Sequence, residues 1–325
     1  ERIGDHRLDP LFTRFDRRNL YVTYDVTSQL REGSNAIGVL LGNGWYNHQS
    51  KAVWDFDRAP WRNRPTFCLD LRITYSDGTV ETIPTDLSWK TASGALVFNS
   101  IYTGEHYDAR LEQKGWNQPD FDDSQWHGVS FRSAPSQQVV AEQSRPIRHV
   151  QTFPARSVKQ INDRTYLFDF GQNMAGVTRI RMSGEAGTEV RIKHGERLSA
   201  DGRLDLSNID VYYRGDQEKE PFQTDILTLS GGEDEFMAGF NYKGFRYVEV
   251  TADRPIALDQ ANLTAYFMHS DVPATGEIHT SSELVNRLWQ ATNNSYLSNL
   301  MGHPTDCPQR EQNGWTGDGH FAIES

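Results

Sequence analysis

The chain has 325 residues, of which 37% are hydrophobic and 24% are charged, and its formal net charge is -11 at pH 7. These values are typical of a globular protein with two or three domains and argue against a disordered or fibrous chain. The negative charge argues against a nucleic-acid partner, which needs a basic face, and the lack of a run of eighteen apolar residues argues against membrane insertion.

From the amino terminus onward, short apolar or alternating runs are separated by turn residues. The runs 36–41 and 68–75 predict strands, and Asp77 with Gly78 between two alternating runs predicts a hairpin turn. Repeated hairpins at this spacing predict an antiparallel β-sandwich over residues 1–140.

A second series of strands follows a stretch rich in Pro and Ser. Such a stretch is typical of a domain boundary. The runs 165–170, 176–182 and 188–194 predict strands, and the last alternates charged with apolar residues, as a half-buried strand does. Residues 141–272 are therefore predicted to form a second antiparallel β-sandwich.

The apolar period then changes, because apolar residues recur every three or four positions from Leu284 to Leu300. This spacing predicts an amphipathic helix, and Thr280 with Glu283 predicts a capping box at its start. One helix has no core of its own and needs other apolar faces to pack against. Residues 273–325 are therefore predicted to be the beginning of an all-α domain.

The segment from Asp306 to Asp318 gathers three carboxylates, one arginine and one tryptophan. Pro308 and two glycines predict a loop that displays its side chains. Cleavage of a glycosidic bond usually needs one protonated and one ionised carboxyl group, and mutual repulsion among three acids raises the pKa of at least one. Glu311 is the best candidate for the protonated acid. A solvated acidic loop without chemistry is the alternative, which the pattern alone leaves open.

The other groups of this loop suit a sugar ligand. Trp315 offers an apolar wall beside the carboxyl group and a face that stacks on a sugar ring. Asp306 and Asp318 are expected to accept hydrogen bonds from sugar hydroxyl groups.

The strings 306–311 and 314–318 together resemble the signature of the bacterial α-L-rhamnosidases of glycoside hydrolase family 78. The resemblance covers nearly the whole chain, because further strings match the family in the same order. These strings are 33–46, 104–110, 116–126, 169–176, 194–196 and 242–247.

The resemblance implies two antiparallel β-sandwich domains, the second concanavalin-like, followed by the first part of an all-α (α/α)6 catalytic barrel. Counted back from Trp315, the family's general acid corresponds to Glu311. Asp306, Arg310, Trp315 and Asp318 are then expected to hold the sugar. Family members invert the anomeric centre, and their general base is a glutamate later in the barrel, which no position here matches.

The function implied is an inverting exo-glycosidase that removes terminal α-L-rhamnose from glycosides or polysaccharides. Without the base, the chain alone is expected to be inactive. Two alternatives remain open: a non-catalytic carbohydrate-binding protein, and a toroid-barrel glycosidase or lyase acting on another sugar.

Only Cys68 and Cys307 are present, which favours neither a disulfide framework nor a CxxC metal site, so no metal and no cofactor are expected. Both ends are expected to be truncated, since neither carries the signal of a natural start or stop. An enzyme of polymeric substrates is expected in the periplasm or outside the cell, but the cytoplasm stays open.

Three further features have two interpretations each. Trp45, Trp54 and Trp61 are compatible with a second sugar platform, although core or interface packing is favoured. Residues 104–108 are compatible with a contribution to the sugar site, although a structural turn is favoured. His194, two residues before a glutamate, is compatible with a metal site, although a hydrogen-bonded strand histidine is favoured.

Overall fold

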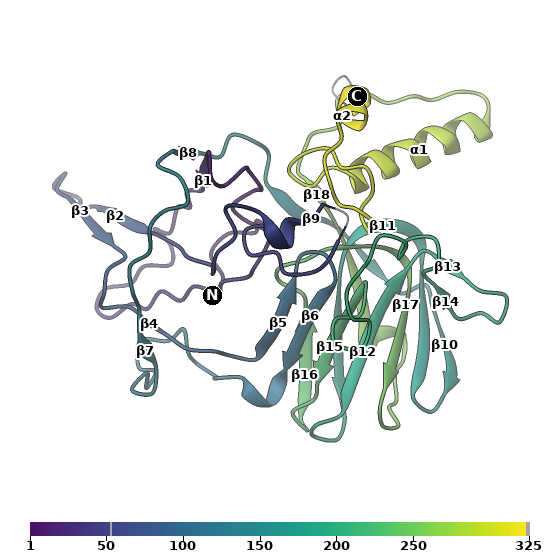
Figure 1. The fold of residues 1–325 in the computed structure, drawn as a ribbon, viewed down its shortest axis with the longest axis horizontal. Helices are drawn as coiled ribbons and strands as arrows, with labels where there is room; N and C mark the ends of the chain where they lie inside the picture. The colour runs from purple at the N-terminus through teal and green to yellow at the C-terminus, as the bar shows by residue number, and fades with distance from the viewer. Residues whose placement is uncertain (53, 323–325) are drawn as a thin grey trace.

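The computed structural model describes residues 1–52 and 54–322. It shows a β-rich body, an amino-terminal part with few strands beside it, and two helices at the carboxyl end (Figure 1). The last three residues of the predicted all-α segment, 323–325, lie outside the described part. Within the described part, no helix has the length and apolar character needed to cross a bilayer.

The elements follow one another as strands, with the two α-helices last. The strands are β1 (Asn19–Tyr21), β2 (Asp70–Thr74), β3 (Val80–Pro84), β4 (Lys90–Thr91), β5 (Leu96–Ser100), β6 (Gly104–Asp108), β7 (His127–Gly128), β8 (Val139–Ala141), β9 (Ile147–Pro154), β10 (Ser157–Asn162), β11 (Thr165–Ser183), β12 (Glu189–Gly195), β13 (Arg197–Leu198), β14 (Leu204–Asp205), β15 (Thr224–Thr228), β16 (Glu233–Met237), β17 (Lys243–Ala252) and β18 (Leu263–Ser270). The helices are the 3-10 turns η1 (Phe56–Arg58), η2 (Ala109–Leu111) and η3 (Gln260–Asn262), and the α-helices α1 (Glu283–Ser298) and α2 (Thr316–Ala322).

Strand β11 is the centre of the large sheet, whose order is β5-β6-β15-β12-β17-β11-β18-β9. Its first half pairs with β10 and β17, and its second half pairs with β18 and β16. The register shifts between Asp169 and Met174, where Gly171 has a φ of 79° that favours glycine. Because its halves have different neighbours, β11 joins two layers, as a sandwich requires.

Several predicted strands are present, with corrected bounds. The run 68–75 contains β2, and Gly78, with a φ of 85°, lies in the turn that follows it. The runs 165–170 and 176–182 are one continuous strand rather than two, because β11 passes through its bulge without ending. Residues 36–41 form no strand, and the prediction there is wrong.

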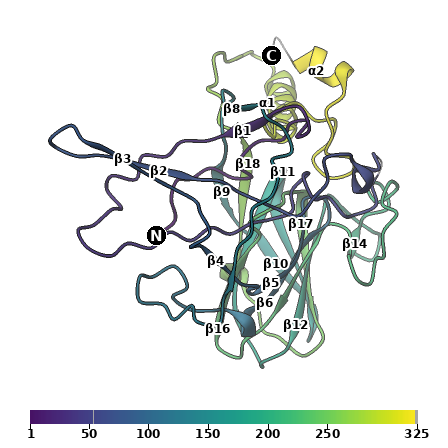
Figure 2. The same ribbon diagram turned by 60° about the vertical axis from the view of Figure 1, so that its left-hand side comes forward.

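The amino-terminal part contributes a hairpin to the large sheet. Strand β6 pairs in parallel with β15, so that His106 lies opposite Ile226. The preferred reading of 104–108 as a turn is therefore wrong, and these residues extend the second β domain's sheet. The other strands before residue 142 form three short pairs, β1 with β8, β2 with β3 and β4 with β7. The β2–β3 hairpin projects away from the body in both views (Figures 1 and 2). The domain limits 1–140, 141–272 and 273–325 stay a prediction.

The core lies between the layers of the β-rich body. Phe168, Phe245, Leu227 and Leu263 have no exposed surface. Burying each such side chain stabilises the fold by about 1.5–3 kcal/mol. The same body is the platform on which the carboxyl-terminal loop lies.

Helix α1 begins two residues later than the predicted capping box implies. The N-cap is Ser282, whose hydroxyl accepts from the Val285 N–H at 3.5 Å. Thr280 is instead held outside the helix, because Asn286 donates to its carbonyl at 2.9 Å. At the other end of the helix, the Asn294 side chain donates to the Asn173 carbonyl in the β11 bulge at 2.7 Å.

The predicted apolar stripe of α1 faces solvent in this chain. Leu284, Val285 and Leu288 expose between 44% and 66% of their surface. Leu297, nearer the end of the helix, packs against the core. The stripe agrees with the expectation that α1 needs other helices to cover it.

Candidate active site

The loop that joins α1 to α2 lies against the beginning of β17. The Gln312 amide donates to the carbonyls of Tyr242 at 3.2 Å and Pro308 at 3.0 Å. A Cβ at Gly244 would come within 2.9 Å of Pro308 Cγ, so glycine allows the loop to lie this close. The loop was predicted to display its side chains, but between residues 305 and 313, where it lies against the beginning of β17, it buries most of them. The buried residues are Thr305, Cys307, Pro308, Gln309, Glu311, Gln312 and Asn313.

Glu311 is only 7% exposed and is held at both its main chain and its carboxyl group. Its N–H donates to Cys307 Sγ at 3.2 Å, and its carbonyl accepts from the Asn313 amide at 2.5 Å. The Trp315 Nε1–H donates to Glu311 Oε2 at 3.1 Å. Trp315 was expected to supply an apolar wall, and the structure gives it a polar contact with the carboxyl group as well.

Gln312 has a φ of 57°, in the left-handed region that a non-glycine side chain rarely adopts. Such a conformation costs on the order of 1–3 kcal/mol and persists only where surrounding contacts enforce it. Here the enforcing contacts are those of its own buried amide with Tyr242 and Pro308. The strained residue directly follows Glu311, so the same contacts fix the backbone that carries the acid.

Asp306 is engaged within the loop. Its Oδ1 accepts from the Asn313 N–H at 3.3 Å, and its Oδ2 accepts from Cys307 Sγ at 3.0 Å. Burial, together with the Asp306 carboxylate, raises the pKa of the Cys307 thiol to about 11. Asp306, Glu311 and Trp315 are thus connected through Cys307 and Asn313.

The other two predicted sugar-binding residues, Arg310 and Asp318, have different surroundings. The Arg310 guanidinium lies 5.6 Å from the centre of the Tyr212 ring. The backbone carbonyl of Arg310 accepts a hydrogen bond from the Tyr102 hydroxyl at 2.6 Å. Asp318 lies exposed in the first turn of α2. The structure therefore brings Asp306, Glu311 and Trp315 together. The Arg310 side chain lies close enough to Cys307 and Glu311 to interact with both, whereas Asp318 lies outside this group.

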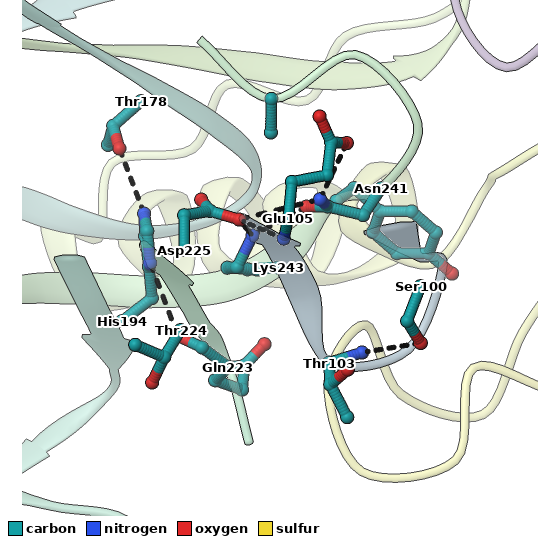
Figure 3. A network of polar contacts seen from close by, with 12 residues as sticks. Ser100, Thr103, Glu105, Thr178, His194, Gln223, Thr224, Asp225, Asn241 and Lys243 are labelled. Carbon is teal, nitrogen blue, oxygen red and sulfur yellow. Dashed lines mark hydrogen bonds and ion pairs between the residues drawn. The ribbon is translucent and has the colours of Figure 1, made fainter. Parts of the chain in front are cut away.

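A buried polar network holds the segment on which the loop lies (Figure 3). Lys243 and Asp225 pair at 2.7 Å with side chains that are 1% exposed. Lys243 also donates to the Asn241 side chain at 2.5 Å. Glu105 of β6 accepts from the N–H groups of residues 239 and 240 and from Asn241. The pKa of Glu105 is raised to about 7, mainly by burial and to a smaller extent by the charge of Asp225.

His194 has the hydrogen-bonded role that was favoured for it. Its ring nitrogens contact the Thr178 hydroxyl at 2.9 Å and the Gln223 carbonyl at 3.3 Å (Figure 3). Burial lowers its pKa to about 3. Glu196 contacts Asn173 instead. Over the described residues, no group of three or more His, Cys, Asp or Glu side chains is arranged to hold a metal ion.

Two of the three tryptophans have the packing role that was favoured for them, and no observation tests the second sugar platform. Trp45 and Trp61 lie in an aromatic cluster around Phe12 and Phe56, as core packing requires. Trp54 lies outside this cluster, 40% exposed. The residues that sequence reasoning missed at the site are Tyr242, Gly244 and Gln312, although 242–247 was one of the strings that carried the resemblance.

Comparison with known families places three profiles in order along the chain. The α-L-rhamnosidase N-terminal domain matches residues 1–151, and the bacterial α-L-rhamnosidase concanavalin-like domain matches residues 159–269. The bacterial α-L-rhamnosidase six-hairpin glycosidase domain matches residues 273–325. These matches confirm the predicted order of two β domains and the start of an all-α catalytic domain.

Individual relatives agree. An α-L-rhamnosidase of Streptomyces avermitilis is 37% identical over 322 residues, which are 98% of this chain and 30% of that protein. An α-L-rhamnosidase of Formosa agariphila is 33% identical over 329 residues, which are 100% of this chain and 34% of that protein. The chain therefore spans about a third of the length of these relatives.

Solved structures show the same fold. The α-L-rhamnosidase from Dictyoglumus thermophilum has a TM-score of 0.88 at 38% identity, over 100% of this chain and 35% of that one. The Streptomyces avermitilis enzyme complexed with L-rhamnose has a TM-score of 0.86 at 35% identity, over 98% of this chain and 30% of that one.

Proposed function

Because the chain belongs to the bacterial α-L-rhamnosidase family, we propose that the whole protein removes terminal α-L-rhamnose from glycosides or polysaccharides, with Glu311 as general acid. The observation that carries the assignment of the acid is the set of contacts that fixes Glu311. Its carboxyl group is held by Trp315, and its backbone is held by Cys307 and by the strained residue that follows. A general acid needs such a fixed orientation toward the leaving oxygen.

The contacts of Glu311 suggest which oxygen delivers the proton. Oε2 accepts from the Trp315 N–H, so Oε1 carries the proton. As the glycosidic C–O bond breaks, this proton passes to the leaving oxygen and Glu311 becomes a carboxylate. The Trp315 N–H then stabilises the charge that develops on that carboxylate.

Inversion requires a second carboxylate that takes a proton from the attacking water. In inverting glycosidases the two carboxyl groups lie roughly 6.5–9.5 Å apart. We place this base in the remainder of the six-hairpin domain, since the chain covers only 30–34% of the relatives. Asp306, Arg310, Trp315 and Asp318 remain our proposed sugar contacts.

The test is Glu311→Gln in the whole protein, with a rhamnosyl glycoside as substrate. Loss of a general acid lowers kcat/KM by roughly 10²–10⁴-fold, and L-rhamnose binding should persist. Glu277→Gln, which changes an exposed acid that pairs with His279, is the matched control and should leave kcat/KM unchanged. Full activity in Glu311→Gln would assign the proton to another group. Glycan retention by a wild-type protein that releases no sugar would identify a binding protein instead.

A further inference from the structure

Trp54 lies beside Trp315 although the two belong to different domains. Their ring centroids are 4.8 Å apart and the ring planes are tilted by 56°. Trp315 is 42% exposed and Trp54 is 40% exposed, so both rings keep free surface. Each indole therefore keeps part of its apolar face exposed beside the other ring.

The position of Trp54 is fixed by its neighbours in the chain. Phe56, two residues later, packs against Trp45 at 5.4 Å and against Trp61 at 6.1 Å. Between them, Asp55 has a φ of 50°, a conformation that Asp adopts more readily than most residues. This turn sends Phe56 into the aromatic cluster and leaves Trp54 outside it.

The aromatic cluster is itself docked against the loop that carries the acid. The rings of Phe12 and His303 lie 6.0 Å apart. The Tyr102 hydroxyl donates to the Arg310 carbonyl at 2.6 Å. These two contacts join the amino-terminal part to the loop before Glu311, and the pairing of Trp54 with Trp315 joins it after Glu311, so this pairing is part of a larger junction.

We propose that Trp54 and Trp315 form the wall of the leaving-group subsite, where a flat apolar ring face of the group released with the sugar packs against them. This inference rests on the proposed function. The Trp315 N–H contacts Glu311, which protonates the leaving oxygen, and the Trp54 ring contacts the Trp315 ring. In an exo-acting enzyme the leaving group points outward from the terminal sugar. Trp54, 40% exposed and supplied by the neighbouring domain, offers a ring face to such a group.

The experiment compares three substrates in the whole protein: phenyl α-L-rhamnoside, a rhamnosyl-glucose disaccharide and methyl α-L-rhamnoside. Loss of one aromatic contact is worth about a three- to tenfold fall in kcat/KM. Trp54→Ala should show this fall mainly through KM. The fall should appear with the phenyl substrate if the subsite binds aryl rings, and with the disaccharide if it binds sugar rings. The methyl substrate, which has no ring to release, should stay within about twofold of wild type, as should inhibition by L-rhamnose.

Two variants separate the ring face from other effects. Trp54→Phe keeps a flat ring and should restore most of the loss. Phe131→Ala, which removes a ring that is 75% exposed, is the control for loss of a surface aromatic and should change none of the three substrates. If Trp54→Ala lowers the Tm by several degrees, Trp54→Leu, which fills more space but has no flat face, replaces it in the same comparison.

The outcomes are distinct. Equal losses on all three substrates, or no loss on any, would overturn the leaving-group assignment while the rhamnosidase proposal stands. A wild-type protein that cleaves none of the three overturns the proposed function and this inference with it.

Discussion

At the scale of single residues, the loop orients Glu311 through contacts with a tryptophan, a cysteine and a glutamine. A tryptophan N–H holds the carboxyl group, a thiol receives its backbone N–H, and a buried amide enforces the strained residue after it. Cys307 links the two acids, because its sulfur donates to Asp306 and accepts from Glu311. The thiol is therefore a structural part of the site.

The two cysteines should differ sharply in reactivity. Cys68 is exposed, whereas Cys307 is buried and has a pKa raised to about 11, which leaves little thiolate at pH 8. A water-soluble disulfide reagent should modify one thiol quickly in the native chain and the second only after denaturation. Cys68→Ser should abolish the fast phase. Two thiols that react equally fast in the native chain would contradict the geometry of the loop.

At this scale the sequence singled out Glu311 and Trp315, which the structure brings into contact, but not the residues that support them. Glu311 and Trp315 carry recognisable chemistry and lie four residues apart. Tyr242 and Gly244 contribute a backbone carbonyl and the absence of a side chain, and neither leaves a signal of chemistry in the sequence. The role of Gln312 depends on the same distant contact, so local pattern could not predict it.

At the scale of elements, the pattern of residues predicted β11 and β12 of the second β domain but missed what depends on tertiary pairing. β11 continues through its bulge because different neighbours pair with its two halves. The run 36–41 has strand-like residues, but the structure gives it no strand. β6 joins the large sheet through a parallel pairing, which connects segments that are distant in sequence and so leaves no local signature.

The buried pair of Lys243 and Asp225 should matter more than any surface ion pair. Lys243→Met leaves the Asp225 charge buried without its partner, which costs about 3–5 kcal/mol of unfolding free energy. Lys219→Met, which removes an exposed partner of Asp216, is the control and should have no measurable effect. Urea unfolding of the two variants measures the difference. Equal small effects would show that the network does not hold this segment.

Glu105 should make stability depend on pH in a defined window. Its pKa is raised from 4.5 to about 7 in the folded chain, so between these values the folded chain binds more protons than the unfolded chain. Its contribution to stability is therefore complete below about pH 4.5 and is lost as the pH rises through about 7.

Comparison with Glu105→Gln isolates this contribution, because the other titrating groups are shared. The unfolding free energy of wild type minus that of the variant should fall from pH 5 to pH 8. A difference that stays constant, or rises, would contradict the raised pKa.

At the scale of the whole molecule, three parts of the chain meet at one loop. The amino-terminal part reaches it through Tyr102 and Trp54, the β-rich body through Tyr242 and Gly244, and α1 leads directly into it. The β domains thus form the base against which the first part of the catalytic domain is placed. The apolar stripe of α1 is what the remaining helices of such a domain would cover.

The 325-residue chain alone should release no rhamnose. It lacks a match to the family's general base, and Leu284, Val285 and Leu288 remain exposed on α1. The same exposure should make the chain bind an apolar fluorescent dye, and Leu284→Glu with Leu288→Glu should weaken that binding without unfolding the chain. Rhamnose release by the isolated chain would show that its own residues supply the base.

We propose that Glu311 gives its proton to the leaving oxygen. The most direct measurement is kcat/KM of the whole protein and of its Glu311→Gln variant on aryl α-L-rhamnosides whose leaving groups span a wide range of acidity. If Glu311 is the general acid, the loss should be large for weakly acidic leaving groups, which need the proton, and should shrink toward none for strongly acidic ones. A loss of the same size across the whole series would contradict this role.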